Sequence, residues 1–193
     1  MSQKSILGFR SGLMILSSNK VNDQFSGRQS FLKNHFSWGK ELYIRTPIKN
    51  KWHTEIALTS YNYRTDRITA GITYDQKVTV VESNIIVLYD VSRPLIVYFP
   101  YLSKLTSYMG LVIAPQMHIN RGNPSGIDDR PESVISYKTG LQFSTFIPIY
   151  KKLGLSSAIK FKTKPFDKYY TGNYIQARPN AEVTWLTGMY LRI

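Results

Sequence analysis

The chain has 193 residues, and its 25 Lys and Arg outnumber its 12 Asp and Glu, so the formal net charge is +13. The length fits one domain of about 100 to 200 residues, 1–193, and the absence of cysteine excludes disulfides, thiolate metal sites and cysteine nucleophiles. Aromatic residues make up 13% and charged residues only 19%, which favours strands. The basic excess favours partners that carry phosphate, such as nucleic acid or anionic lipid.

The N-terminal segment does not have the form of a secretory signal, because Gly8, Arg10 and Gly12 interrupt its apolar run. No stretch of about 18 consecutive apolar residues follows, so the sequence predicts no transmembrane helix. Any membrane crossing must then be made by strands. We expect a signal peptide to have been removed from this chain.

Apolar and polar residues alternate along the first part of the chain, as in strands with one apolar face. Segment 7–15 sets Phe9 opposite Arg10, and segment 36–45 alternates in the same way. Lys40 interrupts the second pattern, and we expect a bulge there.

The middle of the chain alternates less clearly. Segment 52–64 shows a weak alternation, and segment 78–101 is longer than one usual strand. Asp90, Arg93 and Pro94 predict a bend in this long segment, and the sequence leaves open whether it forms one bent strand or two.

The alternation is strongest in the C-terminal half. Segments 107–120, 134–150, 155–163 and 183–193 each have the period of two residues that is typical of a strand. Residues 151–154 connect two of these segments as a tight hairpin.

The connections alternate between short and long. Short ones are predicted near 47–51, 103–106 and 150–154, and long polar ones near 19–30, 65–77, 121–133 and 167–180. Short turns at one end and long loops at the other are typical of outer-membrane barrels. The sequence therefore predicts an all-β fold, a single antiparallel up-and-down transmembrane β-barrel of about eight strands with both termini on the side of the short turns.

The polar face of these strands mixes glycines with long ions of both signs, which fits a narrow lumen in which charges pair across the barrel. The predicted lumen charge network comprises Arg10, Glu41, Arg45, Glu55, Lys138, Lys160, Lys162, Glu182 and Arg192. Alternation alone does not show which face points inward, so a soluble lipocalin-like carrier of an apolar ligand remains an alternative.

The apolar face would then contact lipid, with aromatic side chains at the membrane interfaces. The predicted interfacial aromatics are Trp38, Tyr43, Trp52, Tyr98, Phe99, Tyr101, Tyr150 and Trp185.

Three segments carry a family resemblance: Asp-Val-Ser-Arg-Pro-Leu-Ile-Val-Tyr at 90–98, Thr-Ser-Tyr-Met-Gly-Leu at 106–111, and Gly-Met-Tyr-Leu-Arg-Ile at 188–193. The chain resembles small eight-stranded outer-membrane barrels of the OmpA/OmpX-like kind, particularly the porin-like barrel domains of Bacteroidetes. That family has similar I-P-L and Y-x-G elements, and its last strand ends in Tyr-Arg-Phe, where this chain has Ile193. The resemblance implies a protein of the cell outer membrane of Gram-negative bacteria, often without catalytic activity.

Candidate catalytic and metal-binding residues are few. His35, His53 and His118 lack the spacing of a metal site, and no nucleotide-binding motif occurs, so we expect neither metal nor cofactor. His35 and Ser37 share a strand face, as in lipid A deacylase barrels, which makes a lipid A or phospholipid acyl hydrolase the enzymatic alternative. Those enzymes carry the pair in a later strand with a matching acid, so we predict that the protein is not an enzyme.

The remaining basic residues suggest contacts with lipopolysaccharide phosphates at the outer rim. The candidates are Arg64, Arg67, Lys77, Arg121, Lys164 and Lys168, and an equally good reading is that these charges only keep the loops soluble. No nucleic-acid motif is present. We expect a structural or accessory role in the outer membrane, as a subunit of a larger complex with outer-membrane or periplasmic proteins or as a surface-binding protein, and not as a large-solute pore.

Overall fold

The structure, a computed structural model, describes residues 4–17, 21–23, 28–69, 72–98, 104–121, 133–164 and 179–193. Within these ranges the chain forms ten strands and one short helix. They are β1 (Ile6–Ser17), β2 (Val21–Asp23), β3 (Arg28–Leu32), β4 (Phe36–Lys49), β5 (Trp52–Thr69), β6 (Ile72–Asp90), α1 (Ser92–Tyr98), β7 (Thr106–Arg121), β8 (Ser133–Tyr150), β9 (Leu153–Thr163) and β10 (Ala181–Arg192).

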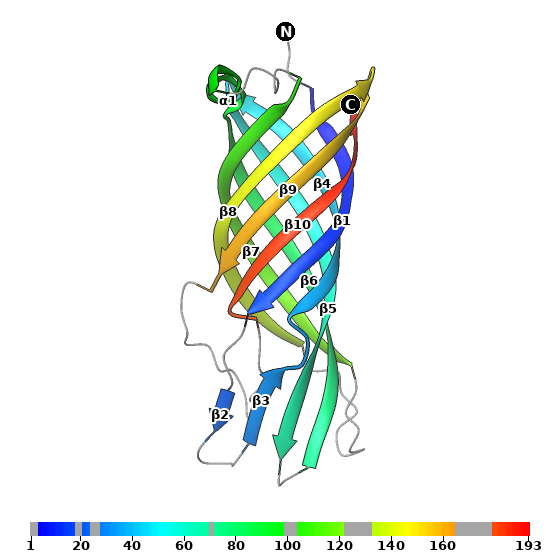
Figure 1. Cartoon of the computed structure of the whole chain (residues 1–193), viewed down its shortest axis with the longest axis vertical. Coiled ribbons are helices and arrows are strands. Elements are labelled where there is room, and N and C mark those ends of the chain that lie inside the picture. The colour runs from blue at the N-terminus through cyan, green and yellow to red at the C-terminus, as the bar shows by residue number, and fades with distance from the viewer. Residues whose placement is uncertain are drawn as a thin grey trace.

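Eight long strands, β1 and β4 to β10, form a closed antiparallel barrel (Figure 1). Neighbours in the barrel are neighbours in the chain, and β1 closes the wall by pairing with β10 from Ile6 opposite Arg192 to Ser17 opposite Ala181. The prediction of an all-β, up-and-down, eight-stranded barrel is therefore confirmed. β1 begins and β10 ends at the same end of the barrel as α1. We call this the turn end, and the opposite end the loop end.

The connection between β6 and β7 differs from the prediction. Segment 78–101, for which the sequence leaves open one bent strand or two, contains the end of one strand and a helix, because β6 ends at Asp90 and α1 follows. The Asp90 carboxylate accepts hydrogen bonds from the backbone N–H and the hydroxyl of Ser92, which starts the helix, and Pro94 lies in its first turn, where its missing N–H costs nothing. The short turn predicted at 103–106 is thus only the end of a longer connection.

The loop end also contains more strand than predicted. Segments 19–30 and 65–77 were expected to be loops, but β2 and β3 form in the first, and β5 and β6 continue as a paired ladder through the second. Strand β3 pairs with the extension of β5, from Gln29 opposite Ile68 to Leu32 opposite Thr65. Strand pairing therefore satisfies many of the backbone groups of these polar segments. The loops predicted at 121–133 and 167–180 lie mostly outside the described residues.

The bulge predicted at Lys40 is wrong. Lys40 pairs in regular register with Ser11 on one side and Ser60 on the other, and the irregularity in β4 lies between Pro47 and Lys49. Proline cannot donate to a ladder, which explains the break at that position. Lys40 therefore keeps the alternation of β4 and its side chain lies on the outer surface.

Buried side chains line the interior in three layers. One hydrophobic cluster, which includes Tyr43, Tyr108, Phe146 and Tyr190, lies toward the turn end. A second cluster around Met14, with Leu16, Leu32, Tyr61, Tyr63, Val78 and Val80, lies toward the loop end. Buried charged residues occupy the level between them. The described residues contain no helix with the length and hydrophobicity of a transmembrane segment.

Candidate functional site

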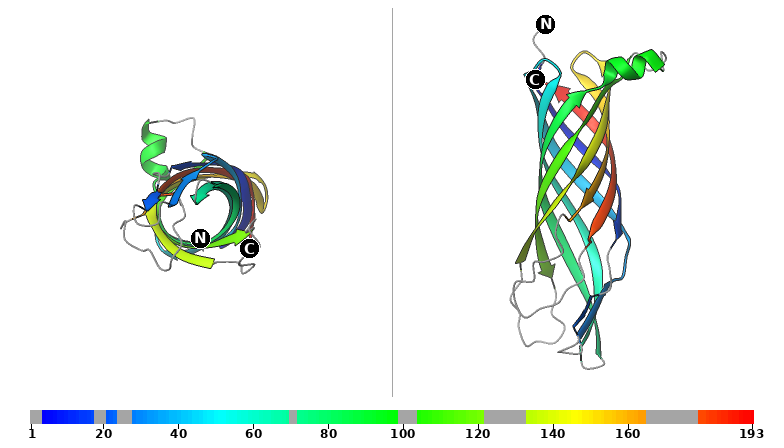
Figure 2. Two further views of the ribbon diagram at one scale, coloured as in Figure 1. Left: turned by 90° about the horizontal axis from the view of Figure 1, so that it is seen from below. Right: turned by 90° about the vertical axis from the view of Figure 1, so that its left-hand side faces the viewer.

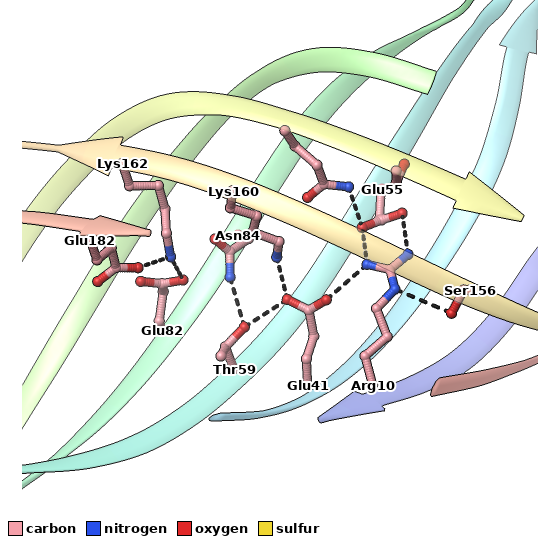
Figure 3. Close-up of polar contacts among 12 residues, drawn as sticks. Arg10, Glu41, Glu55, Thr59, Glu82, Asn84, Ser156, Lys160, Lys162 and Glu182 are labelled. Atoms are coloured by element: carbon pink, nitrogen blue, oxygen red, sulfur yellow. Dashed lines mark hydrogen bonds and ion pairs between the residues drawn. The ribbon is translucent and has the colours of Figure 1, made fainter. Parts of the chain in front are cut away.

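Arg10 is the centre of a buried ion-pair cluster in the barrel interior (Figure 3). Its Nη1 lies 2.9 Å from Glu41 Oε1 and 2.9 Å from Glu55 Oε1, and its Nη2 donates to Glu55 Oε2 at 3.2 Å. Arg10 comes from β1, while the two carboxylates come from β4 and β5. The fork of the guanidinium therefore joins three strands across the lumen.

Further residues complete this first cluster. Lys160 forms an ion pair with Glu41, and the Thr59 hydroxyl donates to Glu41 at 2.8 Å. Gln142 donates to Glu55 Oε1 at 3.0 Å. Each carboxylate thus accepts bonds from several strands, as a buried charge requires.

Arginine side chains also pack on the aromatic cluster toward the turn end. The Arg10 Cζ lies 3.6 Å from the centroid of the Tyr43 ring, and the Arg45 Cζ lies 4.0 Å from the Phe146 ring and 4.2 Å from the Tyr108 ring. Cation–π contacts away from water are stronger than exposed ones. They couple the charged level to the hydrophobic cluster that fills the turn end.

A second ion-pair cluster lies nearer the loop end. Lys138 Nζ lies 2.6 Å from Glu182 Oε2, and Lys162 bridges Glu182 and Glu82. The Tyr61 hydroxyl donates to Glu182 at 3.1 Å. The cluster has two cations and two carboxylates, so its charge is balanced.

Eight of the nine residues predicted for the lumen network lie in the interior and take part in these clusters: Arg10, Glu41, Arg45, Glu55, Lys138, Lys160, Lys162 and Glu182. Arg192 does not join them. It is half-buried at the turn end, with its Cζ 5.9 Å from the Tyr190 ring.

Glu82 is the interior carboxylate that sequence reasoning missed. On β6 the inward positions include Val78, Val80, Ile86 and Leu88, so both faces of the strand are apolar and the alternation is hidden. The available signal was a single carboxylate within an apolar run.

The arrangement joins strands across the barrel interior. Its five cations and four carboxylates contact one another, and the hydrophobic clusters fill the interior on both sides of them. An eight-stranded barrel has an interior just wide enough for side chains or one small ligand, and here buried side chains occupy it. The clusters therefore link strands that face each other across the lumen.

The predicted His35 and Ser37 pair makes other contacts. The His35 Nδ1 lies 3.0 Å from the Leu16 carbonyl oxygen, and the Ser37 hydroxyl donates to the Asn62 carbonyl at 2.5 Å. Neither contact resembles a nucleophile and its base. Among the described residues, no group of three or more His, Asp and Glu could hold a metal ion.

The residues predicted to contact lipopolysaccharide are only partly described. Arg64 and Lys77 are exposed at the loop end and lie opposite each other in the β5–β6 ladder. Lys164 is half-buried just after β9. The side chains of Arg67 and Arg121, and all of Lys168, lie outside the described residues.

The predicted interfacial aromatics divide into two groups. Trp38, Trp52, Tyr98, Tyr150 and Trp185 are exposed on the outer surface. Tyr43 is a correction, because it is buried in the interior, where its hydroxyl donates to Ser156 at 3.0 Å. It shares the inward face of β4 with Glu41 and Arg45. Phe99 and Tyr101 lie outside the described residues.

Comparison with known proteins finds similarity in structure alone. No protein-family model matches the chain, and no curated protein matches its sequence. The outer membrane protein OprG from Pseudomonas aeruginosa is similar over 100% of this chain and 97% of its own, with a TM-score of 0.61 and 9% identity.

Two further solved structures share the fold. Neisserial surface protein A matches over 98% of this chain and 97% of its own, with a TM-score of 0.58 and 9% identity. Ail, the attachment invasion locus protein of Yersinia pestis, solved in complex with the heparin analogue sucrose octasulfate, matches over 99% of this chain and 100% of its own, with a TM-score of 0.51 and 10% identity. The chain thus has the fold of small barrels known from outer membrane and surface proteins.

Proposed function

We propose that the protein is an integral barrel of the outer membrane of a Gram-negative cell. The observation that carries this proposal is the polarity of the wall: Trp38 is 61% and Leu111 is 66% exposed on the outside, while Arg10 and Glu55 are fully buried inside. A soluble barrel has the opposite polarity. An apolar outer band over charged interior positions is the pattern of a barrel in lipid.

The filled lumen supports a structural or accessory role over transport. Ion pairs cross the interior, and aromatic and aliphatic side chains fill it toward both ends. A solute path would require several of these contacts to break together. Buried ion pairs that lose a partner are costly, so the closed state is strongly favoured.

Lys40 supports a contact between this barrel and another protein within the membrane. It is exposed on β4, on the same face as Trp38 and Leu42. A lysine on the lipid face costs about 2–4 kcal/mol at the bilayer midplane and about 0–1 kcal/mol near the interfaces. A carboxylate on a partner barrel would offset that cost, which favours an accessory subunit of a larger assembly.

The outward neighbours of Lys40 strengthen this argument. The row that runs through it across six strands is entirely polar: Ser60, Lys40, Ser11, Thr187, Ser157 and Thr145. One of the adjacent outward rows is entirely apolar: Leu58, Leu42, Phe9, Met189, Leu155 and Ile147. The polar groups therefore lie within an otherwise apolar wall.

The test is purification from isolated outer membranes in mild detergent, followed by mass spectrometry of whatever is recovered with the protein. We expect a membrane or periplasmic protein to be recovered in stoichiometric amount with the unaltered chain. The control variant Lys77→Leu, altered at the loop end, should recover the same protein. Lys40→Leu should lose that protein. Recovery of the barrel with lipid alone would contradict the accessory role, and a protein monodisperse without detergent would contradict the membrane assignment and favour a soluble carrier.

A second candidate is binding of phosphate-bearing lipopolysaccharide at the loop end. Arg64 and Lys77 are exposed cross-strand neighbours there, and the similar Ail structure holds a sulfated ligand. Two adjacent cations suit an anionic group. The double variant Arg64→Gln and Lys77→Gln should bind lipopolysaccharide several-fold more weakly in calorimetry, and unchanged binding would dismiss the role.

A further inference from the structure

The charged side chains described at the turn end are almost all basic. They are Lys4, Lys49, Lys51, Arg93, Lys104, Lys151, Lys152 and Arg192, against one carboxylate, Asp90, whose oxygen is bound to Ser92. We call the six cations on the three connections, Lys49, Lys51, Arg93, Lys104, Lys151 and Lys152, the basic collar. These connections join β4 to β5, β6 to β7 and β8 to β9, and Lys4 and Arg192 lie at the seam between β1 and β10, so the charge is not confined to one side.

The loop end has a different charge pattern. There Lys33 Nζ lies 3.0 Å from Asp75 and 3.7 Å from Asp66, and Arg64 lies 3.9 Å from Asp75. The hydrogen bond from Lys33 to Asp75 raises the pKa of that lysine. Lys33 and Arg64 at the loop end are thus close to carboxylates of the same chain, whereas Asp90 is the one acidic side chain among the described residues near the basic collar.

Aromatic rings lie where the basic collar meets the apolar band. Lys51 Nζ lies 5.6 Å from the centroid of the Tyr89 ring, and Trp52 packs edge-to-face on Tyr89 with their centroids 5.0 Å apart. On another turn, Lys151 Nζ lies 5.1 Å from the Tyr150 ring. Exposed aromatics followed by cations are typical of the level at which acyl chains give way to lipid headgroups.

Helix α1 extends this level outward from the wall. Figure 2 shows the helix outside the barrel at the turn end. The Ser92 hydroxyl accepts a bond from the Ser107 N–H at 2.9 Å, which ties the helix to β7. Val97 and Tyr98 are 77% and 78% exposed, and Arg93 is exposed as well. Helix α1 therefore presents apolar, aromatic and basic side chains outside the barrel wall, at the same end as the basic collar.

We propose that the basic collar binds the phosphates of anionic phospholipids in the leaflet next to the turn end, with α1 lying in the headgroup region. The inference rests on the proposed membrane-spanning function. A planar anionic surface meets all three connections at once, which a folded protein docked on one side would not do. Clusters of Lys and Arg at a membrane surface attract acidic lipids, and ionic strength weakens the attraction.

The test compares lipid preference in refolded protein. Spin-labelled phosphatidylglycerol and phosphatidylcholine are titrated into the protein in phosphatidylcholine vesicles, and the motionally restricted fraction of each is measured. We expect the unaltered chain to prefer phosphatidylglycerol about threefold or more at low salt, with the preference falling in about 0.5 M salt.

Two variants, each of which removes four positive charges, distinguish binding at the basic collar from attraction of acidic lipids to the net positive charge of the protein. Lys49→Gln, Lys51→Gln, Lys151→Gln and Lys152→Gln together should remove the preference. Lys33→Gln, Arg64→Gln, Lys77→Gln and Lys164→Gln together, at the loop end, should retain it. Loss in both variants, or in neither, would overturn the assignment to the collar.

Two other results would also be decisive. A heat-modifiable, protease-protected barrel without lipid preference would overturn this inference and leave the proposed function standing. A barrel that does not insert would instead contradict the proposed function. The variant with four Gln substitutions in the basic collar could keep its lipid preference and lose a co-purified acidic protein. In that case the collar would be a protein-docking surface and the lipid proposal would be wrong.

Discussion

Arg45 and Glu55 are direct cross-strand partners on β4 and β5, and their side chains meet inside the barrel. Arg45 donates to Glu55 Oε2 through Nε at 3.1 Å and Nη2 at 2.5 Å. The pair is unequal, because Glu55 also accepts two bonds from Arg10, whereas Glu55 is the only carboxylate that contacts Arg45 among the described residues.

This inequality predicts unequal costs of substitution. Glu55→Gln should reduce the free energy of unfolding by about 3–5 kcal/mol, because it leaves Arg45 buried without a carboxylate. Arg45→Met should cost less than half as much, since Glu55 keeps Arg10. Urea unfolding in lipid vesicles measures both values. The double variant should cost less than the sum of the two, and strict additivity would show that the pair is not coupled.

Gly140 is predicted to be intolerant of a side chain. A Cβ there would overlap the carbonyl oxygen of Phe161 on β9, a backbone atom that cannot move without separating the strands. Gly140→Ala should therefore cost about 1–3 kcal/mol of unfolding free energy. Gly39→Ala is the matched control, because its Cβ would first meet the flexible Met14 side chain at 2.6 Å and should cost less. Equal costs would contradict this account.

Tryptophan depth tests the orientation of the barrel in lipid. Trp185 lies in an apolar outward row beside Leu13 and Ile159, while Trp52 lies at the turn end beside Tyr89. In single-tryptophan variants made with Phe, bromines deep in the acyl chains should quench Trp185 more, and bromines near the headgroups should quench Trp52 more. Equal quenching at every depth would conflict with a transmembrane orientation.

Ser37 should be dispensable for any lipid chemistry of the host cell. Its hydroxyl is bound to the Asn62 carbonyl, and His35 contacts the Leu16 carbonyl. Ser37→Ala is therefore expected to leave the acyl composition of lipid A and phospholipids unchanged in mass spectrometry. A change that His35→Ala reproduces would revive the hydrolase alternative.

The period of two residues was sufficient to predict the barrel and most of its interior. Arg10 and Glu41 could be assigned to one face because their neighbours in β1 and β4 alternate clearly. Glu82 could not be assigned to the inward face in this way. The inward face of β6 is apolar on both sides of Glu82, because these positions belong to the two hydrophobic clusters.

Local capping and strand pairing explain the other errors of prediction. Helix α1 depends on the Asp90 carboxylate bonding to Ser92, a short-range contact that strand periodicity does not reveal. The extension of β5 and β6 depends on pairing between two polar segments, whose composition also suits a loop. Which cations find carboxylates within the chain likewise depends on the fold, as the contrast between Lys33 and Lys151 shows.

The pairing of β1 with β10 has a consequence for biogenesis. Until β10 has been synthesised and paired, β1 has one row of backbone groups with no strand beside it. Lipid cannot satisfy such groups, so partly made chains are unsuited to enter the bilayer alone. The pairing of β1 with β10 also joins residues that are far apart in the sequence, such as Ile6 and Arg192. Contacts between residues so distant in the chain form slowly. The pairing of β1 with β10 should therefore be a late step of assembly. Before it, the unpaired chain must be kept in water in a protected form or be held by an insertion factor.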